Sequence, residues 1–462
     1  MSAEAKGGGF ALAFAIAVLL IPAALGSSTT IFNDGDVSWH IATGQWILDQ
    51  RAIPYSDPFS FTHAGKPWVP IEWLAEVMMA GAYRLAGYRG IAALVTAALI
   101  ALHAIVFLNA ARFLRPFAAV GVIVLMDMVL VPMMLARPHL LAWALVAGWT
   151  WLMLRAREGA RAPPLAAALL MIVWANLHGS FVLGLAIAAA FGLEALLATP
   201  DKGRVVRQWG LFGLACAGAV LVNANGIEGV THPFRIANMA ILPLIEEWKP
   251  SSYRVTPFFF LILAGSLLLV ALKRPKLPVV RWLMLGGLVV LALLQVRHQA
   301  MLAIVATMLV PTGFARRSLT VERKPALLAA AAALALVAVR AILPLSPEYG
   351  ETHPWRLIAA VPAELRGEPV LNGYAMGGPL ILSGIRPYID GRGDMYGDEL
   401  VTDYKRIIDG DPAALAAAVE QWNIRWAILP NRHARLNAQL ERAPGWRRIR
   451  KDEVGAVYVR AP

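Results

Sequence analysis

The chain has 462 residues, of which 58% are hydrophobic and only 16% are charged. Apolar runs of about 16–22 residues recur along it, the length that crosses a bilayer, so the composition excludes a soluble protein and predicts a polytopic membrane protein. The net charge of +12 would suit nucleic acid, but basic cytoplasmic loops explain it in a membrane protein, and we expect no nucleic-acid partner. The single cysteine, Cys216, excludes a disulfide within one chain.

The first apolar segment follows Lys6 and predicts a span at 10–26 that acts as an uncleaved signal anchor. Residues 27–70 are polar, rich in aromatic residues and proline, and too long for a plain connector. The next segment, 71–87, is just long enough to span but carries Glu72, Glu76 and Arg84. A charge at the centre of a span costs roughly 2.5–3.5 kcal/mol, so we expect an amphipathic helix on the outer membrane surface instead.

The remaining apolar runs predict further spans near 91–111, 117–135, 139–156, 164–177, 179–198, 207–222, 257–272, 280–296, 299–315 and 326–343. With the 71–87 helix outside, the basic residues of alternate connections gather on one side, as the positive-inside rule requires. We therefore expect about eleven transmembrane helices in a bacterial inner membrane, with the N-terminus cytoplasmic and the C-terminus periplasmic.

Residues 344–462 leave the membrane and predict a periplasmic α/β domain, so that 1–343 form the transmembrane module with its periplasmic loop 27–90. The expected helices of this domain lie near 354–366, 397–408, 412–422 and 433–443. The expected strands lie near 369–372, 380–383, 386–389, 425–429, 446–450 and 455–460.

Polar residues gather in the predicted outer connections. The loop after the first span holds Asp34, Asp36, Trp39 and His40, and later connections hold Arg137, His139, Asn176, His178, Asn225, Arg297 and His298. Polar turns at membrane depth usually line a cavity, so this one-sided gathering predicts a site. Within the spans, His103 is typical of a satisfied core histidine, whereas Asp127 has no evident partner.

This set of residues suits a sugar donor that carries a lipid phosphate. Transfer from such a donor needs a carboxylate that deprotonates an acceptor hydroxyl or amine, and cations that hold the developing phosphate charge. Asp36 or Asp34 can supply the carboxylate, and Arg137 and Arg297 can supply the cations, because a planar guanidinium matches phosphate. Trp39 could stack on a sugar face, although anchoring at the membrane interface is the commoner role of tryptophan at this depth.

Each acid also has a structural alternative. Asp34 lies in a turn-like Asn-Asp-Gly sequence, where Asp often bonds the local backbone, and Asp36 could be the N-cap of a helix that begins near Val37. Glu72 could be catalytic, could bind a metal, or could be the first-turn acid of its helix.

A cation site and a covering turn are two further hypotheses. Asp34, Asp36 and His40 could ligate a divalent cation such as Mg²⁺ or Mn²⁺, but Asp-x-Asp is a weak signal, and no metal ligand is assigned. Asp390 and Arg392, in the sequence Asp-Gly-Arg-Gly-Asp, could reach over the site or form a salt-bridged turn of the C-terminal domain.

The loop after the first span, with Asp34-Gly35-Asp36 and Trp39-His40, is followed by an amphipathic stretch that begins Glu72-Trp73-Leu74. This arrangement resembles the GT-C superfamily of integral-membrane glycosyltransferases, which use polyprenyl-phosphate-linked sugars. It is similar to the first-loop acid and juxtamembrane helices of protein O-mannosyltransferases and lipid A aminoarabinose transferases. The family's basic-Pro-Pro-Leu pattern is replaced here by Pro-Ile-Glu-Trp-Leu.

Further short motifs resemble a bacterial branch of the same superfamily over nearly the whole chain: Trp68-Val69-Pro70-Ile71-Glu72-Trp73-Leu74, Ala136-Arg137-Pro138-His139, Asn176-Leu177-His178-Gly179-Ser180-Phe181, Ile389-Asp390-Gly391-Arg392 and Asp403-Tyr404. The resemblance implies that the first-loop acid is Asp36, with Asp34 as its rival.

The sequence thus predicts an inverting glycosyltransferase that acts on the periplasmic face. Its expected partners are the bilayer, a polyprenyl-phosphate sugar donor and a glycan, lipid or protein acceptor. Asp36, Asp34 and Glu72 are the candidate catalytic residues, and the other polar residues named above are candidates for substrate binding. Two alternatives come from other classes: a transporter or flippase, which would show broken helices and charges deep in its spans, and a non-catalytic envelope assembly protein.

Overall fold

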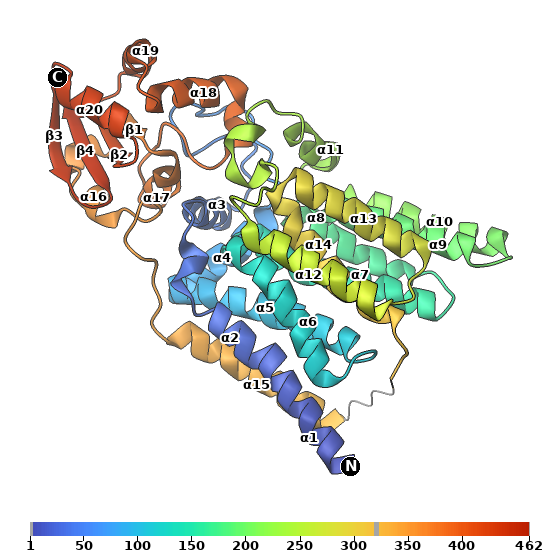
Figure 1. Ribbon diagram of the computed structural model, residues 1–462. Coiled ribbons are helices and arrows are strands. Elements are labelled where there is room, and N and C mark those ends of the chain that lie inside the picture. Colours follow the sequence, from blue (N-terminus) through green and yellow to red (C-terminus); the bar gives the residue numbers. More distant parts are fainter. Residues whose placement is uncertain (1–2, 318–322, 462) are drawn as a thin grey trace. The chain divides into compact units, whose positions relative to one another are not determined.

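The computed structural model describes residues 3–317 and 323–461 (Figure 1). The chain divides into two compact units. The first comprises Met1–Ser28, Arg89–Val230 and Pro243–Pro344, and the second comprises Thr29–Tyr88, Thr231–Leu242 and Leu345–Pro462. The second unit therefore combines the loop after the first apolar helix with the C-terminal stretch, although about 250 residues of chain separate them.

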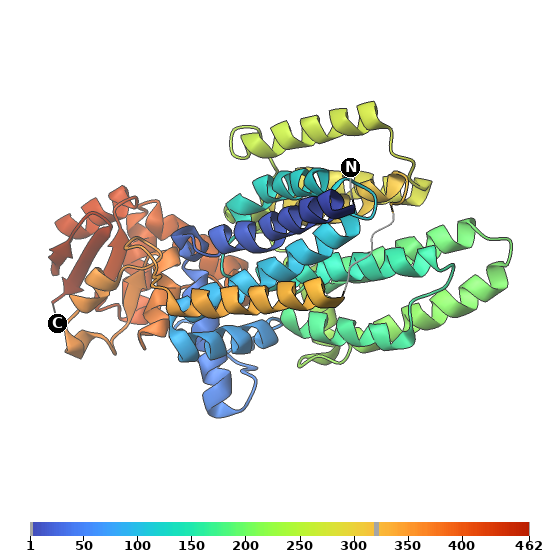
Figure 2. The same cartoon turned by 90° about the horizontal axis from the view of Figure 1, so that it is seen from below.

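The first unit is a bundle of helices that run roughly alongside one another (Figures 1 and 2). Its first rod joins α1 (Ala3–Phe14), a π-helical segment (Ala15–Leu20) and α2 (Ile21–Leu25). The helices that follow are α5 (Tyr88–Ala110), α6 (Pro116–Leu130), α7 (Pro138–Glu158), α8 (Leu169–Leu177), α9 (Phe181–Leu197), α10 (Lys202–Val220), α12 (Pro257–Lys273), α13 (Val279–Leu294), α14 (Gln299–Leu309) and α15 (Arg323–Ile342). The helix α11 (Gly226–Ile236) begins in the first unit and belongs to the second from Thr231 onward. Each segment predicted to span the membrane is helical over most of its length.

Three helical stretches in the described residues are long and apolar enough to cross a membrane: Tyr88–Ala110, Pro116–Met133 and Lys324–Ile342. Five further apolar helices are shorter, so the predicted count of about eleven spans is not confirmed. On α15, only 6% of the apolar window is buried inside the protein, and Leu328 and Leu334 are exposed. A helix that is apolar on all sides and covered by little protein is typical of one that contacts lipid.

Two ionisable side chains inside the first unit, His103 and Asp127, pair with each other. His103 of α5 lies with its Nε2 3.0 Å from Asp127 Oδ2 of α6, and its Nδ1 is 2.7 Å from the carbonyl oxygen of Leu99. His103 is therefore a satisfied core histidine as predicted, and it is also the partner that the sequence did not reveal for Asp127. A histidine and an acid on different helices show no spacing signal, because only the packing of the helices brings them together.

The second unit begins with two helices, α3 (Asp36–Gln50) and α4 (Trp73–Ala86). The predicted helix at 71–87 is confirmed as α4, and it packs closely on α3 because Gly44 has no side chain. A Cβ at Gly44 would lie 1.9 Å from the carbonyl oxygen of Glu76. This close approach places the acids of α4 beside α3.

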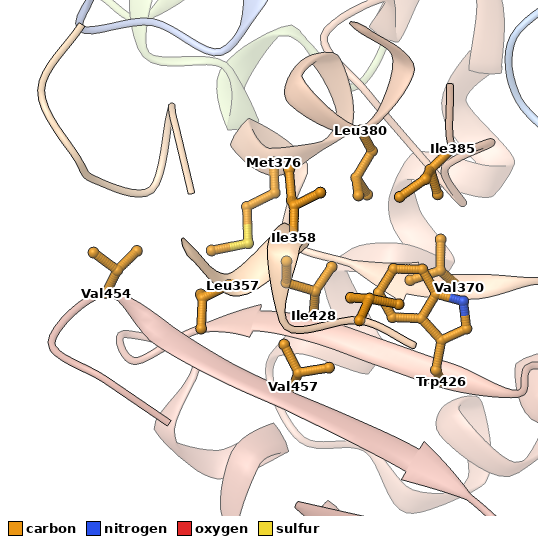
Figure 3. Close-up of a cluster of buried hydrophobic side chains, with 11 residues drawn as sticks. Leu357, Ile358, Val370, Met376, Leu380, Ile385, Trp426, Ile428, Val454 and Val457 are labelled. Carbon is orange, nitrogen blue, oxygen red and sulfur yellow. The ribbon is translucent and has the colours of Figure 1, made fainter. Parts of the chain in front are cut away.

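The C-terminal part of this unit is an α/β fold with a four-stranded sheet. Its strands are β1 (Val370–Asn372), β2 (Trp426–Pro430), β3 (Trp446–Lys451) and β4 (Gly455–Arg460), in the order β1-β2-β4-β3. β1 and β2 are parallel, and the other two pairs are antiparallel. The helices are α16 (Trp355–Ala359), α17 (Gly377–Leu382), α18 (Gly393–Ile408), α19 (Pro412–Trp422) and α20 (Ala434–Arg442). Figure 3 shows the core, in which residues of α16 and α17 such as Leu357 and Leu380 face Ile428 and Val457 of the sheet.

Two strand predictions in this part are wrong. Residues 380–383 end the helix α17, whose first turn contains Pro379, a residue that favours a helix start. Residues 386–389 form one isolated bridge, between Pro387 and Val370, and no strand. Proline has no N–H to donate, so it cannot continue a ladder.

Candidate functional site

The acid loop (residues 33–36) precedes α3 and separates the roles of its two aspartates. Asp34 Oδ1 accepts a hydrogen bond of 2.9 Å from the backbone N–H of Asp36, so Asp34 holds the turn, as its structural alternative predicted. The N-cap of α3 is Gly35, and the helix begins at Asp36 itself. The hypothesis that Asp36 is an N-cap is therefore wrong, and its half-buried carboxylate does not cap α3.

The carboxylate of Asp36 lies directly against the C-terminal stretch of the same unit. A Cβ at Gly391 would be 1.7 Å from Asp36 Oδ1 and 2.8 Å from Trp39 Nε1. A Cβ at Gly378 would be 2.1 Å from the carbonyl oxygen of Gly35. Because Gly378 and Gly391 have no side chains, the backbone at both positions can touch the acid loop. The Asp390–Arg392 turn, which contains Gly391, therefore borders Asp36.

The same turn is anchored by a buried ion-pair network, as its salt-bridged alternative predicted. Arg392 is 1% exposed; its Nε and Nη2 donate to Asp390 Oδ1 and Oδ2 at 2.8 and 2.6 Å, and its Nη1 donates to Asp57 Oδ1 at 2.7 Å. The guanidinium lies over the rings of Trp68 and Phe59. Burial alone would lower the pKa of Arg392, but Asp390 and the other neighbouring acids raise it well above its ordinary value. Arg392 is therefore a fixed clamp that positions Gly391.

His40, one turn after Asp36 on α3, faces two acids of α4. Its Nδ1 lies 3.2 Å from Glu76 Oε1, and its Nε2 lies 3.9 Å from Glu72 Oε2. Burial, with a further contribution from the charge of Glu72, raises the pKa of Glu76 well above its ordinary value. The ring of Trp39, which is 7% exposed, packs on His40 with centroids 3.6 Å apart. Glu76 was not a predicted site residue, although its i, i+4 spacing from Glu72 is a signal that both acids share one helix face.

The predicted cation site is not formed by the described residues. Over residues 3–317 and 323–461, no three His, Cys, Asp or Glu side chains converge at metal-ligand spacing. His40, the imidazole expected to join Asp34 and Asp36, is directed instead at Glu76 and Glu72. The residues present therefore do not fit a metal held by that set.

The first unit contains an arginine cluster made of Arg137, Arg297 and Glu247. Arg137 precedes Pro138 at the start of α7, and its Nη1 lies 3.3 Å from Glu247 Oε2. Burial would raise the pKa of Glu247, but Arg137 and Arg297 outweigh it and lower the pKa. Arg297 stacks on Trp248, with its guanidinium carbon 4.0 Å from the ring centroid. Two guanidinium groups share one carboxylate, so the cluster keeps a net positive charge that suits an anion.

Histidines and asparagines of the first unit frame this cluster. His178 Nδ1 lies 2.8 Å from Ser180 Oγ, and the ring centroids of His178 and His139 are 6.4 Å apart. Burial, then the nearby charges of His139, Arg297 and Arg137, hold the pKa of His178 well below its ordinary value, so this imidazole is neutral at physiological pH. Burial and Arg297 likewise lower the pKa of His298 to about 4.

The side chain of Asn176 holds backbone in place, and the backbone of Asn225 is itself held by a neighbour. Asn176 Nδ2 donates to the carbonyl oxygens of Ile172 and Val222, at 2.8 and 2.9 Å, and its Oδ1 accepts from the N–H of Ala224. The N–H of Asn225 donates to Asn223 Oδ1 at 2.8 Å. The turns at 176–180 and 222–226 are thus fixed to each other by hydrogen bonds.

The predicted site residues therefore fall into two groups, one in each unit. Asp34, Asp36, Trp39, His40, Glu72, Asp390 and Arg392 lie in the second unit, and Arg137, His139, Asn176, His178, Asn225, Arg297 and His298 lie in the first. Sequence reasoning missed Asp57, Glu76 and Glu247, the acidic partners that hold the predicted residues in place. Nothing in the local sequence of Asp57 marks it, because its partner lies 335 residues away.

Known proteins resemble this chain in fold. No family model and no curated protein matches the sequence. The apo crystal structure of the oligosaccharyltransferase of Archaeoglobus fulgidus matches over 90% of this chain and 69% of its own, with a TM-score of 0.54 and 11% identity. The oligosaccharyltransferase AglB of the same organism, in complex with an inhibitory peptide and a dolichol-phosphate, matches over 96% and 74%, with a TM-score of 0.53 and 10% identity. This likeness shows the fold alone: the chain shares the fold of the archaeal oligosaccharyltransferase, which is the fold that the expected resemblance implies.

Proposed function

We propose that this protein is a membrane glycosyltransferase that transfers a sugar from a polyprenyl-phosphate-linked donor to a glycan, lipid or protein acceptor. In this proposal it lies in a bacterial inner membrane and acts on the periplasmic face. The GT-C fold and the apolar helices support a lipid-linked donor, and one of the similar structures was solved with a dolichol-phosphate bound.

The proposal rests on the different contacts that the two aspartates of the acid loop make. Asp34 is occupied by the turn, whereas the carboxylate of Asp36 is set against Gly391 by the Arg392 clamp. A carboxylate held by rigid backbone on an ordered helix start is suited to accept a proton in a fixed direction. Asp36 is accordingly the proposed general base.

In the reaction, Asp36 takes the proton of the acceptor hydroxyl or amine while that oxygen or nitrogen forms a bond to the anomeric carbon of the donor. The bond between this carbon and the phosphate oxygen breaks, and the polyprenyl phosphate leaves with the electron pair. Attack opposite the leaving group inverts the anomeric configuration. Arg137 and Arg297, the candidate cations of the first unit, are proposed to stabilise the developing phosphate charge, and Glu247 pairs with Arg137.

Paired substitutions of the two aspartates test this function. In Asp36→Asn we expect sugar transfer from a radiolabelled polyprenyl-phosphate donor to fall by about 10²–10⁴-fold, the usual contribution of a general base. Asp34→Asn keeps an oxygen that can accept from the Asp36 N–H, so its transfer rate should stay within about tenfold of wild type. Near-normal turnover in a folded Asp36→Asn protein would remove Asp36 from the catalytic role.

A further inference from the structure

A pocket of about 280 Å³ opens in the second unit beside the acid loop. Its lining includes Ser38 of α3, Tyr88, His353, Trp355 and Pro379 of α17. Ser38 follows Asp36 by two residues, and the charge of Asp34 acts on the imidazole of His353. The pocket, here called the Trp355 pocket, therefore lies within electrostatic reach of Asp34 and belongs to the same compact unit as the acid loop.

One wall of the pocket carries a buried polar atom that lacks a partner. His353 is 4% exposed, and its Nε2 has no hydrogen-bond partner among the described residues, whereas its Nδ1 lies 3.2 Å from Thr352 Oγ1. The ring of Tyr88 packs edge-on against the imidazole, with centroids 5.7 Å apart, and fixes its plane. A buried polar atom left unsatisfied costs about 1–3 kcal/mol, so a ligand hydroxyl that reached this nitrogen would remove that cost.

The chemistry of the walls selects a neutral ligand. None of the residues that line the pocket carries a formal charge, and burial lowers the pKa of His353 to about 4, so its imidazole is neutral at physiological pH. Phosphates and carboxylates have nothing here to pair with. A ligand hydroxyl can bond to a neutral imidazole as donor or acceptor, according to the tautomer, and to the serine hydroxyls of the wall.

The shape and the aromatic surface of the pocket suit a sugar ring. Trp355 is 45% exposed and, with the ring of Tyr88 and the side chain of Ile358, offers a flat apolar wall next to the polar one. A pyranose has the same two sides, an apolar C–H face and a rim of hydroxyls. The volume is at the small end of ligand pockets, which hold about 300–1,000 Å³, so it accommodates a single ring and no long chain.

We propose that the Trp355 pocket binds a neutral sugar residue of the acceptor, so that the acceptor is an uncharged glycan. Identifying this sugar as part of the acceptor rests on the proposed function, whereas the binding of a neutral sugar in the pocket does not. The sugar stacks on Trp355, bonds His353 Nε2 through a hydroxyl, and presents a further hydroxyl to the acid loop.

Binding is tested by saturation-transfer NMR on the full-length protein in detergent. The probes are the methyl glycosides of glucose, galactose, mannose and N-acetylglucosamine, with methyl glucuronide and glucose 1-phosphate as charged counterparts. We expect at least one neutral glycoside to bind, and Trp355→Ala and His353→Leu to weaken it by about tenfold or more. His353→Gln keeps a polar group and should stay within about threefold. Tyr55→Ala, which removes an aromatic ring of similar exposure elsewhere in the unit, should change nothing.

The inference is overturned if no neutral glycoside binds, if Trp355→Ala binds as wild type does, or if the charged sugars bind equally well. A transfer assay separates this failure from failure of the proposed function. Suppose that Asp36→Asn abolishes donor hydrolysis or transfer, while Trp355→Ala still transfers to a neutral glycan as wild type does. That result would refute sugar binding in the pocket and keep the proposed function. If the protein binds the neutral sugar but shows no transfer, the pocket is kept and the proposed function is refuted.

Discussion

Gly391→Ala probes the contact between the acid loop and the C-terminal stretch. The added Cβ would lie 1.7 Å from Asp36 Oδ1, whereas real Cβ atoms essentially never approach another heavy atom within 3.0 Å. The carboxylate and the turn must therefore separate by at least 1.3 Å, the difference between these two distances. Gly391 cannot yield easily, because Arg392 is held by Asp390 and Asp57. Overpacking of this kind costs about 1–3 kcal/mol of stability.

The effect on catalysis should be larger than the effect on folding. A misplacement of about 1 Å costs on the order of 10²-fold in rate, so we expect kcat of Gly391→Ala to fall about a hundredfold. The base acts in the transition state, so kcat and kcat/KM should fall together while KM for the donor is unchanged. The assay is steady-state transfer from a radiolabelled polyprenyl-phosphate sugar, with thermal unfolding measured on the same preparations.

Gly367→Ala is the matched control, since a Cβ at Gly367 has no heavy atom within 4 Å. It should transfer sugar and unfold as the wild type does. If Gly391→Ala is folded and equals Gly367→Ala in kcat, the carboxylate of Asp36 is not positioned by this turn, and the reasoning is refuted. A selective rise in KM would instead assign the contact to substrate binding.

Three further predictions concern charges. Arg392→Met leaves buried carboxylates without their cation and should lower the free energy of unfolding by about 3–5 kcal/mol in denaturant titrations, whereas Arg356→Met, at an exposed ion pair, should cost at most about 1 kcal/mol. Burial raises the pKa of Glu76 above the unfolded value near 4.5, so the native state keeps this proton longer and loses stability as pH rises from 4.5 through the folded pKa. The Tm of Glu76→Gln should therefore rise relative to the Tm of wild type between about pH 5 and pH 8. A Tm difference that does not change with pH would argue against a protonated Glu76. Arg297→Ala should raise KM for the donor by about ten- to a hundredfold, while Arg254→Ala, at an exposed arginine of the connection before α12, should leave it unchanged. Equal KM values in Arg297→Ala and wild type would remove Arg297 from phosphate binding.

Much of the fold follows from the sequence because its signals are local. The apolar runs predicted helices at 91–111 and 139–156, which correspond to α5 and α7, and the charges at Glu72 and Arg84 predicted the helix α4. The last two strands were predicted within a residue or two because turns bound them and because they contain the β-branched and aromatic residues typical of strands. The helix α17 was mistaken for a strand since six apolar and small residues show no clear period.

The candidate site was only half visible, because its contacts are not local. Asp36 and Arg137 stand out by residue type, but their neighbours Gly391 and Glu247 lie more than a hundred residues away along the chain. A single sequence contains no record of such proximity. The direction of the His40 side chain illustrates the same limit: helical spacing places it near Asp36, yet packing of α3 on α4 turns it toward Glu76.

The position of the Asp390–Arg392 turn also changes how the non-catalytic alternative can be tested. If the catalytic site were distant from the C-terminal domain, deletion of that domain would separate the two hypotheses: an assembly protein would lose its function and an enzyme would keep it. The domain packs against the acid loop, and its removal would take away Gly391 and the arginine that positions it. Both hypotheses therefore predict loss of function on deletion. Only changes that preserve this packing can distinguish them, and Asp36→Asn does so because it removes one charge and no atom of volume: a silent Asp36→Asn favours assembly, and a folded but inactive one favours catalysis.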